Sequence, residues 1–217
     1  MIELAIAQLK TIGGPIIVVL ILLSIAAASI TFMKVFEFIR LGVGRHNAAH
    51  DALGLWERGD REAAVKRLTN DKASVSKVLS RVMRALDDPN IQVAAVREDA
   101  FGFALDLLTR MRRHLRALDT IVQAAPMLGL LGTVLGMIDV FGKLELGGGS
   151  VDPSQLAGGI WVALLTTALG LVVAIPFYFV TSWLESRIEN ERIAIETSVA
   201  MVLARRLAVS TPTRTPL

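Results

Sequence analysis

The sequence predicts an all-α membrane protein with three transmembrane helices and long cytoplasmic helical extensions. Of its 217 residues, 53% are hydrophobic and only 20% are charged, and the mean hydropathy is +0.55. Average soluble domains are about 45–50% apolar and about 25% charged. Three stretches without Asp, Glu, Lys or Arg, of 23, 19 and 32 residues, are Thr11–Met33, Thr120–Ile138 and Pro153–Leu184. Since about 20 residues cross a bilayer as a helix, each stretch is long enough to span it.

The first element is a transmembrane helix over residues 11–33, preceded by a short segment, residues 1–10. Ala26–Ala28 resembles the small-residue cleavage site of a signal peptide. The apolar run is longer than the roughly 7–15 residues of a signal-peptide core, and most of the nearby positive charge follows it. We therefore expect a retained helix.

Residues 34–118 are predicted to form a cytoplasmic helical region. The segment beginning at Asp60 and ending at Leu68 is typical of a capped helix, and Ser76–Leu86 predicts a second. From Ile91 to Leu118 an amphipathic pattern continues without a helix breaker into the second span, residues 119–142. This pattern predicts one long helix that projects from the membrane.

The remaining elements are a short loop, a third span and a C-terminal helix. Residues 143–153 are rich in glycine and predict a tight connection, so the second span and the third, residues 154–184, should be antiparallel neighbours. The apolar pattern continues after the third span, which predicts a helix and tail over residues 185–217. No internal repeat of the kind found in many secondary transporters is present.

The positive charges predict the orientation of the chain. Residues 34–118 contain 16 of the 23 Lys and Arg residues, and residues 185–217 contain five. By the positive-inside rule these two regions are cytoplasmic, and the N-terminus and the loop at 143–153 are periplasmic. The sequence pI of about 9.6 is therefore explained by orientation in a lipid membrane. With one tyrosine and three tryptophans, no stacking platform for nucleic acid is expected.

The second and third spans each carry a face of small and hydroxyl-bearing residues. At 100° per residue, these faces cover arcs of about 140° and about 100°. Their members are Ala125, Pro126, Gly129, Gly132, Thr133, Gly136 and Asp139 in the second span, and Gly159, Ala163, Thr166, Thr167, Gly170 and Ala174 in the third. Small faces are often seams where helices pack, whereas three threonines at mid-membrane depth favour a polar path. Both interpretations stay open.

The spans lack the ionisable groups that normally mark a proton or cation path. The nearest carboxylate is Asp139, at the outer end of the second span, where it is expected at a solvated boundary. If ions cross, the titrating group is expected to come from a separate partner helix.

Two motifs resemble the signatures of the MotA/TolQ/ExbB proton channel family. The first is APMLGLLGTVLGMI, residues 125–138, and the second is ALLTTALGLVVAIP, residues 163–176. Their order and spacing, three spans and a large region between the first two resemble the ExbB/TolQ branch. The related flagellar stator subunits of the MotA type are longer and have four spans.

The resemblance implies a homopentamer in the bacterial inner membrane that surrounds two ExbD/TolR-like single-span partner helices, each with an essential Asp. It implies proton flow coupled to mechanical work on the cell envelope or to transport across it. Thr133 and Thr167 match the pore-facing threonines of the family, and Thr166 lies beside them. The residues expected to pack at the pore face are Pro126, Gly129, Gly132, Gly136, Gly159, Ala163, Gly170, Ala174 and Pro176. Asp139 is a candidate carboxylate at the outer mouth.

One position departs from the family pattern. Many relatives carry Glu in the third span within Gly-Ile-x-Glu-Ala-Leu, and here Val162 occupies that position. The substitution indicates a divergent partner or ion, or a glutamate that this branch does not need.

Other function classes are weaker predictions. His46 and His50 are spaced i, i+4, but no Glu follows His46 as in His-Glu-x-x-His, so we expect solvated histidines and neither a metal site nor an enzyme. Cysteine is absent, which excludes thiol chemistry, and no cofactor motif is present. A flagellar-type stator relative and a passive helical scaffold remain as alternatives.

Overall fold

The computed structural model describes residues 14–88, 90–146 and 153–210, and every regular element in these ranges is an α-helix. Three described stretches are long and apolar enough to cross a membrane: Gly14–Leu41, Val93–Glu145 and Leu156–Leu207. The predicted class of all-α membrane protein with three spanning helices is therefore confirmed. The predicted N-terminal segment, residues 1–10, and most of the loop at 143–153 lie outside the described residues.

The helix expected to run unbroken from Ile91 into the second span is interrupted, so that prediction is wrong. Helix α6 (Val93–Arg112) and helix α7 (Leu115–Leu146) are separated at Arg113 and His114. His114 has φ +68°, in the left-handed region, where the right-handed helix cannot continue. Histidine is among the residues that adopt this conformation most readily after glycine. The break therefore carries no Gly or Pro signal in the sequence.

The chain divides into two compact units. The described residues within 14–34 and 114–182 form the apolar unit, and those within 35–113 and 183–210 form the polar unit. Helices α2 (Gly14–Leu41) and α8 (Pro153–Ser210) contribute to both. The predicted extension of the third span is confirmed, because α8 continues as one helix past Leu184.

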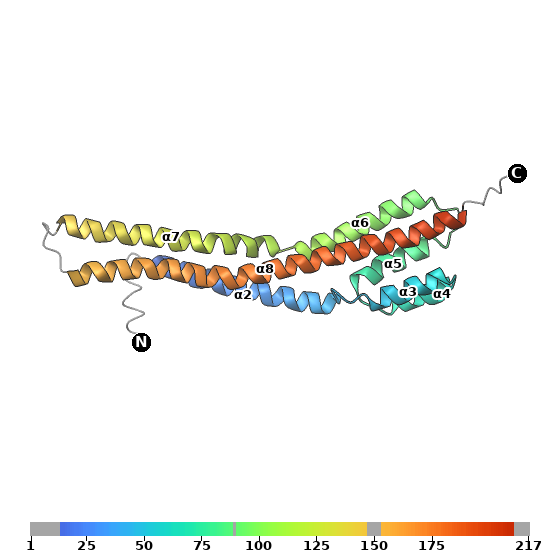
Figure 1. Ribbon diagram of the computed structural model, residues 1–217, viewed down its shortest axis with the longest axis horizontal. Coiled ribbons are helices and arrows are strands. Elements are labelled where there is room, and N and C mark those ends of the chain that lie inside the picture. Colours follow the sequence, from blue (N-terminus) through green and yellow to red (C-terminus); the bar gives the residue numbers. More distant parts are fainter. Residues whose placement is uncertain (1–13, 89, 147–152, 211–217) are drawn as a thin grey trace. The chain divides into compact units, whose positions relative to one another are not determined.

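In the apolar unit, α7 and α8 run antiparallel and side by side, as the colours in Figure 1 show. The first part of α2 packs on this pair through a small buried cluster formed by Ile16, Leu20, Ala125 and Ala174. Much of the remaining apolar surface is open: Met127 is 71% exposed and Trp161 is 64% exposed. Such a surface is suited to lipid or to neighbouring chains.

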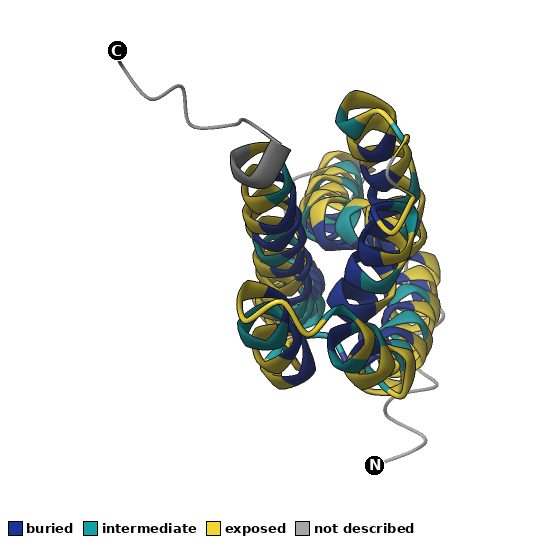
Figure 2. Cartoon of the chain, turned by 90° about the vertical axis from the view of Figure 1, so that its right-hand side faces the viewer, coloured by how far each residue is buried: buried dark blue, intermediate teal, exposed yellow. Residues whose placement is uncertain are grey.

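The polar unit is a bundle with a core of bulky side chains. It contains α3 (Asn47–Glu57), α4 (Arg61–Thr69), α5 (Ser74–Ala85), α6 and the last part of α8. Its buried core includes Val75, Val78, Leu79, Val82 and Met83 of α5, together with Ile195 and Val199 of α8. Figure 2 shows the buried positions of these helices on their inward sides and the exposed positions outside.

Local signals explain where several of these helices begin and end. The predicted capped helix corresponds to α4, where Asp60 Oδ1 accepts a hydrogen bond from the Ala63 N–H at 3.1 Å. The second predicted helix corresponds to α5. Helix α2 ends at Leu41. The next residue, Gly42, has φ +63°, and the N–H groups of Gly42 and Val43 donate to the carbonyls of Ile39 and Phe38, respectively. Helix α3 was not predicted as a separate element.

Candidate functional site

The small face of α7 packs against the small face of α8, and we call this contact the α7–α8 seam. Its members are Ala125, Gly129, Gly132 and Gly136 of α7 and Ala163, Thr166, Thr167 and Gly170 of α8. A Cβ atom on Gly136 would lie 2.9 Å from Ala163 Cβ, and one on Gly170 would lie 2.6 Å from the Ala125 carbonyl oxygen. The seam therefore depends on glycine, because backbone approaches backbone too closely for a side chain.

Two threonine hydroxyls cross the seam to one carbonyl. Thr167 Oγ1 donates to the Gly129 carbonyl oxygen at 3.1 Å, and Thr166 Oγ1 lies 3.2 Å from the same oxygen. Thr166 Oγ1 also contacts its own helix at the Ala163 carbonyl, 2.7 Å away. Thr166 is fully buried, whereas Thr167 is half-buried. The Thr166 hydroxyl is thus engaged in helix packing within one chain.

Thr133 has a different environment from the other two threonines. Its hydroxyl donates to the Leu130 carbonyl of its own helix at 2.7 Å, and its side chain is half-buried. It lies at one end of a hollow of about 600 Å³ along α7. Of the three threonines named from the sequence, only Thr133 lines this hollow.

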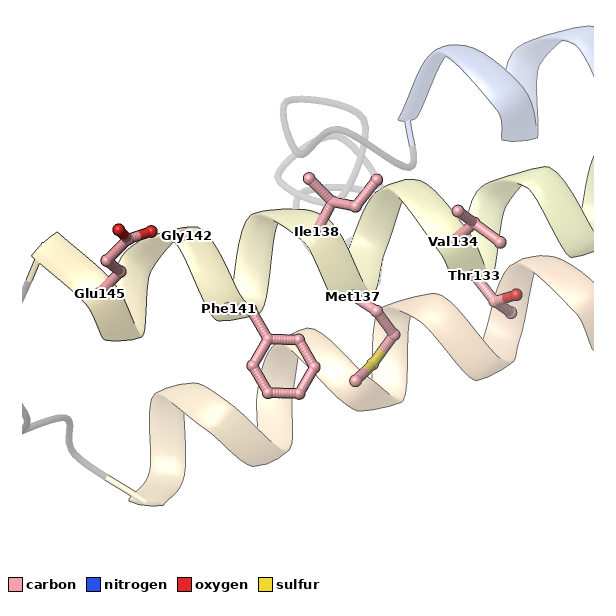
Figure 3. Close-up of a pocket in the computed structure, with 7 residues that line it drawn as sticks. All are labelled: Thr133, Val134, Met137, Ile138, Phe141, Gly142 and Glu145. Atoms are coloured by element: carbon pink, nitrogen blue, oxygen red, sulfur yellow. The ribbon is translucent and has the colours of Figure 1, made fainter.

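The hollow is mostly apolar with a polar group near each end. Its lining residues are Thr133, Val134, Met137, Ile138, Phe141, Gly142 and Glu145. Figure 3 shows Met137 and Phe141 on one side of α7, Val134 and Ile138 on the other, and Glu145 at the end away from Thr133. The sequence reasoning identified only Thr133 here.

The other residues that the sequence assigned to the pore face lie on α7 and α8 beyond the members of the α7–α8 seam. Gly159 is half-buried against Val140, and a Cβ atom there would collide with the Val140 side chain. Val162, at the position of the family glutamate, is half-buried. Pro126 lies inside α7 and Pro176 inside α8. Because proline has no N–H, the carbonyl four residues before each lacks its usual helical donor.

Asp139 is held by an ion pair at the end of α7. Lys143 Nζ donates to Asp139 Oδ2 at 2.6 Å, one turn away on the same helix. The Asp139 side chain is 27% exposed. The Lys143 ammonium therefore already balances the charge of the Asp139 carboxylate.

The structure corrects the prediction that His46 is simply solvated. His46 Nε2 lies 3.0 Å from Oε2 of Glu191, a fully buried carboxylate of α8 that the sequence reasoning did not identify. His50 is exposed, as expected. Among the described residues, no three His, Asp or Glu side chains are grouped to hold a metal ion.

Comparison with known proteins finds one matching family and several relatives with ExbB-type names. The model of the family described as "MotA/TolQ/ExbB proton channel family" matches residues 70–197, more than half of the chain. A putative biopolymer transport protein ExbB homolog from Methanothermobacter thermautotrophicus is 36% identical over 64% of this chain and 48% of its own length. A putative biopolymer transport protein ExbB-like 1 from Synechocystis is 33% identical over 75% of this chain and 64% of its own length.

A third relative, biopolymer transport protein exbB1 from Vibrio cholerae, is 36% identical over 64% of this chain and 60% of its own length. The chain therefore spans about half to two thirds of the length of these curated relatives.

Proposed function

Because the chain belongs to the MotA/TolQ/ExbB proton channel family, on its ExbB/TolQ branch, we propose that it is the ring-forming subunit of an ion-driven motor in the bacterial inner membrane. The motor couples proton flow to mechanical work on the cell envelope or to transport across it. The N-terminus lies in the periplasm and the C-terminus in the cytoplasm, in accordance with the positive-inside rule.

The observation that carries this proposal is the absence of a free titrating group in the spans. Residues 120–138 and 154–184 contain no charged side chain, and the flanking Asp139 is paired with Lys143. A proton path needs a group that can bind and release the ion within the membrane. A single-span partner with one Asp, similar to ExbD or TolR, supplies that group.

The threonines differ in how well they suit a role beside that Asp. Thr133 is half-buried beside an open hollow, and its hydroxyl bonds only within its own helix. Thr167 is also half-buried, but its hydroxyl bonds across the seam. Thr133 and Thr167 are therefore proposed to face the ion path. Thr166, which is fully buried, positions α8 against α7.

Assembly into a ring is supported by the surface of the apolar unit. Bulky exposed side chains cover the outward faces of α7 and α8, including Met127, Leu130, Ile138, Leu164 and Tyr178. One chain does not cover these faces, so neighbouring copies, partner helices and lipid are proposed to do so. Five copies around two partner helices is the arrangement that the family resemblance implies.

The energy available to such a motor is modest. One charge that crosses 100 mV releases about 2.3 kcal/mol. A switch from a 1:99 to a 99:1 population of two states requires about 5.5 kcal/mol. At ordinary potentials, roughly two or three protons are therefore needed for each complete switch.

The decisive experiment is native mass spectrometry of the chain purified with a co-expressed single-span protein encoded beside it. We expect several copies of the chain to retain the partner, and Asp→Asn in the partner to abolish proton flux in liposomes without dissociating the complex. A complex that conducts protons equally well without the partner would contradict the proposal.

The role of the threonines needs its own variant and control. Thr133→Val with Thr167→Val should reduce proton flux, because two hydroxyls that favour the ionised partner Asp are removed. Thr120→Val is the matched control, since Thr120 is an exposed α7 threonine that bonds its own helix at Arg116. Unchanged flux in the double variant would exclude this role.

A passive scaffold is the second candidate, and one observation favours it. Both Thr166 and Thr167 donate across the seam, so two of the three threonines are satisfied by packing alone. Under that alternative the complex assembles, proton flux is at background level, and the partner Asp is dispensable.

A further inference from the structure

A fully buried carboxylate in the polar unit is not used by the proposed motor. Glu191 Oε2, on α8, accepts a hydrogen bond from the Gly44 N–H at 3.0 Å and lies 3.0 Å from His46 Nε2. Its second oxygen, Oε1, is buried and has no hydrogen-bond partner among the described residues. A half-satisfied buried carboxylate is costly, because water no longer solvates the charge.

The carboxylate ties the turn between α2 and α3 to α8. Helix α3 begins at Asn47, directly after His46, and no side chain caps its first turn. Gly44 has φ +84°, and a Cβ atom there would lie 3.2 Å from Arg187 Nη1. The left-handed glycine thus directs its N–H to Glu191. The Gly44 N–H and His46 Nε2 therefore both contact the same oxygen, Glu191 Oε2.

His46 can exchange protons with water while it contacts the buried carboxylate. Its side chain is 28% exposed, whereas that of Glu191 is 0% exposed. Histidine is the side chain that normally gains and loses a proton between about pH 5 and 8. A protonated imidazole makes a charge-assisted hydrogen bond to a carboxylate, and one tautomer of the neutral ring offers no proton at Nε2.

We propose that Glu191, His46 and the Gly44 N–H form a proton-binding clasp that holds the α2–α3 turn to α8 more tightly when His46 is protonated. The clasp is a pH-responsive element of the polar unit. It does not depend on the motor proposal, because all three groups belong to this chain and to one unit.

Other charged groups nearby have interactions of their own. Burial raises the pKa of Asp71, but hydrogen bonds and the charge of Arg45 in the same turn together hold it below its usual value. Arg112 of α6 pairs with Glu189 at 3.4 Å, and Arg187 lies over the Trp183 ring at 5.4 Å. The further titratable or charged groups on the last two turns of α2 and the first turns of α3 are Lys34, Glu37, Arg40, His50 and Asp51. His46 Nε2 lies 3.0 Å from Glu191 Oε2, so protonation of His46 is the change that the clasp senses.

Hydrogen–deuterium exchange of the full chain in lipid nanodiscs tests the clasp. Peptides covering residues 42–50 are followed at pH 6 and pH 8, with rates corrected for intrinsic exchange. We expect protection of the Gly44 amide to be about three- to tenfold greater at pH 6. Glu191→Gln should accelerate exchange by about tenfold or more at both pH values, because a hydrogen bond to a charged acceptor is lost.

His46→Gln separates titration from structure. Glutamine can still donate a hydrogen bond to Glu191 but does not titrate, so the difference between pH 6 and pH 8 should disappear while the turn stays folded. Glu196→Gln is the control, since Glu196 is an exposed α8 carboxylate paired with Arg192. It should leave both rates unchanged.

Two results would overturn the proposal: equal protection of the wild-type turn at both pH values, or a pH difference that persists in His46→Gln. If Glu191→Gln fails to fold, as seen by circular dichroism, the exchange rates of the wild type and of His46→Gln at pH 6 and pH 8 still test the proposal.

Discussion

The helices within the apolar unit and the helices within the polar unit pack together in different ways. In the apolar unit, α7 and α8 meet through glycine, alanine and threonine, and a Cβ atom at Gly129 would be 2.9 Å from the Thr166 carbonyl oxygen. In the polar unit, α5 presents fully buried Val78, Leu79 and Met83 to the surrounding helices. One contact is made by backbone proximity and the other by interlocking side chains.

This difference follows from the solvent expected around each unit. In water, burial of a bulky apolar side chain stabilises a fold by about 1.5–3 kcal/mol, so a bundle gains from large residues inside. In lipid that gain vanishes between helices, and close packing with interhelical hydrogen bonds takes its place. The large residues of the apolar unit accordingly lie outside, where Leu22 is 60% exposed and Ile138 is 62% exposed.

The largest effect is expected in the core of the polar unit. Leu79→Ala should lower the free energy of unfolding by about 2–5 kcal/mol, because it leaves a cavity among fully buried neighbours. Thermal and denaturant unfolding of the full chain in detergent measures this loss. Leu105→Ala is the control, since Leu105 is 67% exposed, and a comparable loss there would contradict the assignment of the core.

The seam should be sensitive to added volume, in contrast to the core. Gly132→Ala places a methyl group against the Thr166 side chain, which is itself held by hydrogen bonds. We expect a loss of about 1–3 kcal/mol from overpacking. Gly142→Ala on the same helix meets no atom within 4 Å and should be neutral or slightly stabilising. Equal behaviour of the two variants would show that α7 and α8 are not in close contact.

Removal of one seam hydroxyl should have a smaller effect. Thr166→Val retains the shape but leaves the Gly129 carbonyl with one interhelical donor, Thr167, and we expect a loss of about 0.6 kcal/mol. Thr181→Val is the control, because the buried Thr181 hydroxyl bonds the Phe177 carbonyl of its own helix. Paired melting curves in the same detergent distinguish an interhelical bond from a local one.

The smallest effect concerns the dependence of the polar unit on pH. Burial raises the pKa of Asp71, but the Ser76 hydroxyl, two backbone N–H groups and Arg45 outweigh it and hold the pKa below its usual value. A carboxyl with a lowered folded-state pKa stabilises the fold above the unfolded pKa of about 3.9, and this stabilisation is lost as the pH falls through the folded value. Asp71→Asn should therefore melt below the wild type at pH 7, with a smaller difference at pH 3. A constant difference would contradict this interpretation.

Most of the helices could be predicted because their signals are local. The Asp60 cap identified α4, and the continuous pattern after Trp183 identified the extension of α8. The break at His114 could not be predicted, since the sequence there contains no residue that requires a left-handed backbone. Helix α3 was not predicted either, and no side chain caps its first turn.

For the candidate site, the sequence predicted which residues share a helix face and did not predict which atoms they contact. Helical periodicity assigns Thr133, Thr166 and Thr167 to small faces of two helices, and it leaves open what each face meets. In the structure Thr166 is enclosed in the seam, whereas Thr133 borders the hollow with Glu145. The pairing of Asp139 with Lys143 is an i, i+4 contact and was readable in principle.

The three spans, the small faces and the family motifs can all be identified without a structure, because hydropathy and helical period are properties of neighbouring residues. Tertiary structure alone decided which small residues touch, where the long helix breaks, and that Glu191 is buried beside His46. Glu191 and His46 are separated by 145 positions, and no local pattern reports a contact between segments so far apart. Such contacts arise only when packing brings one face of α8 to the turn that follows α2.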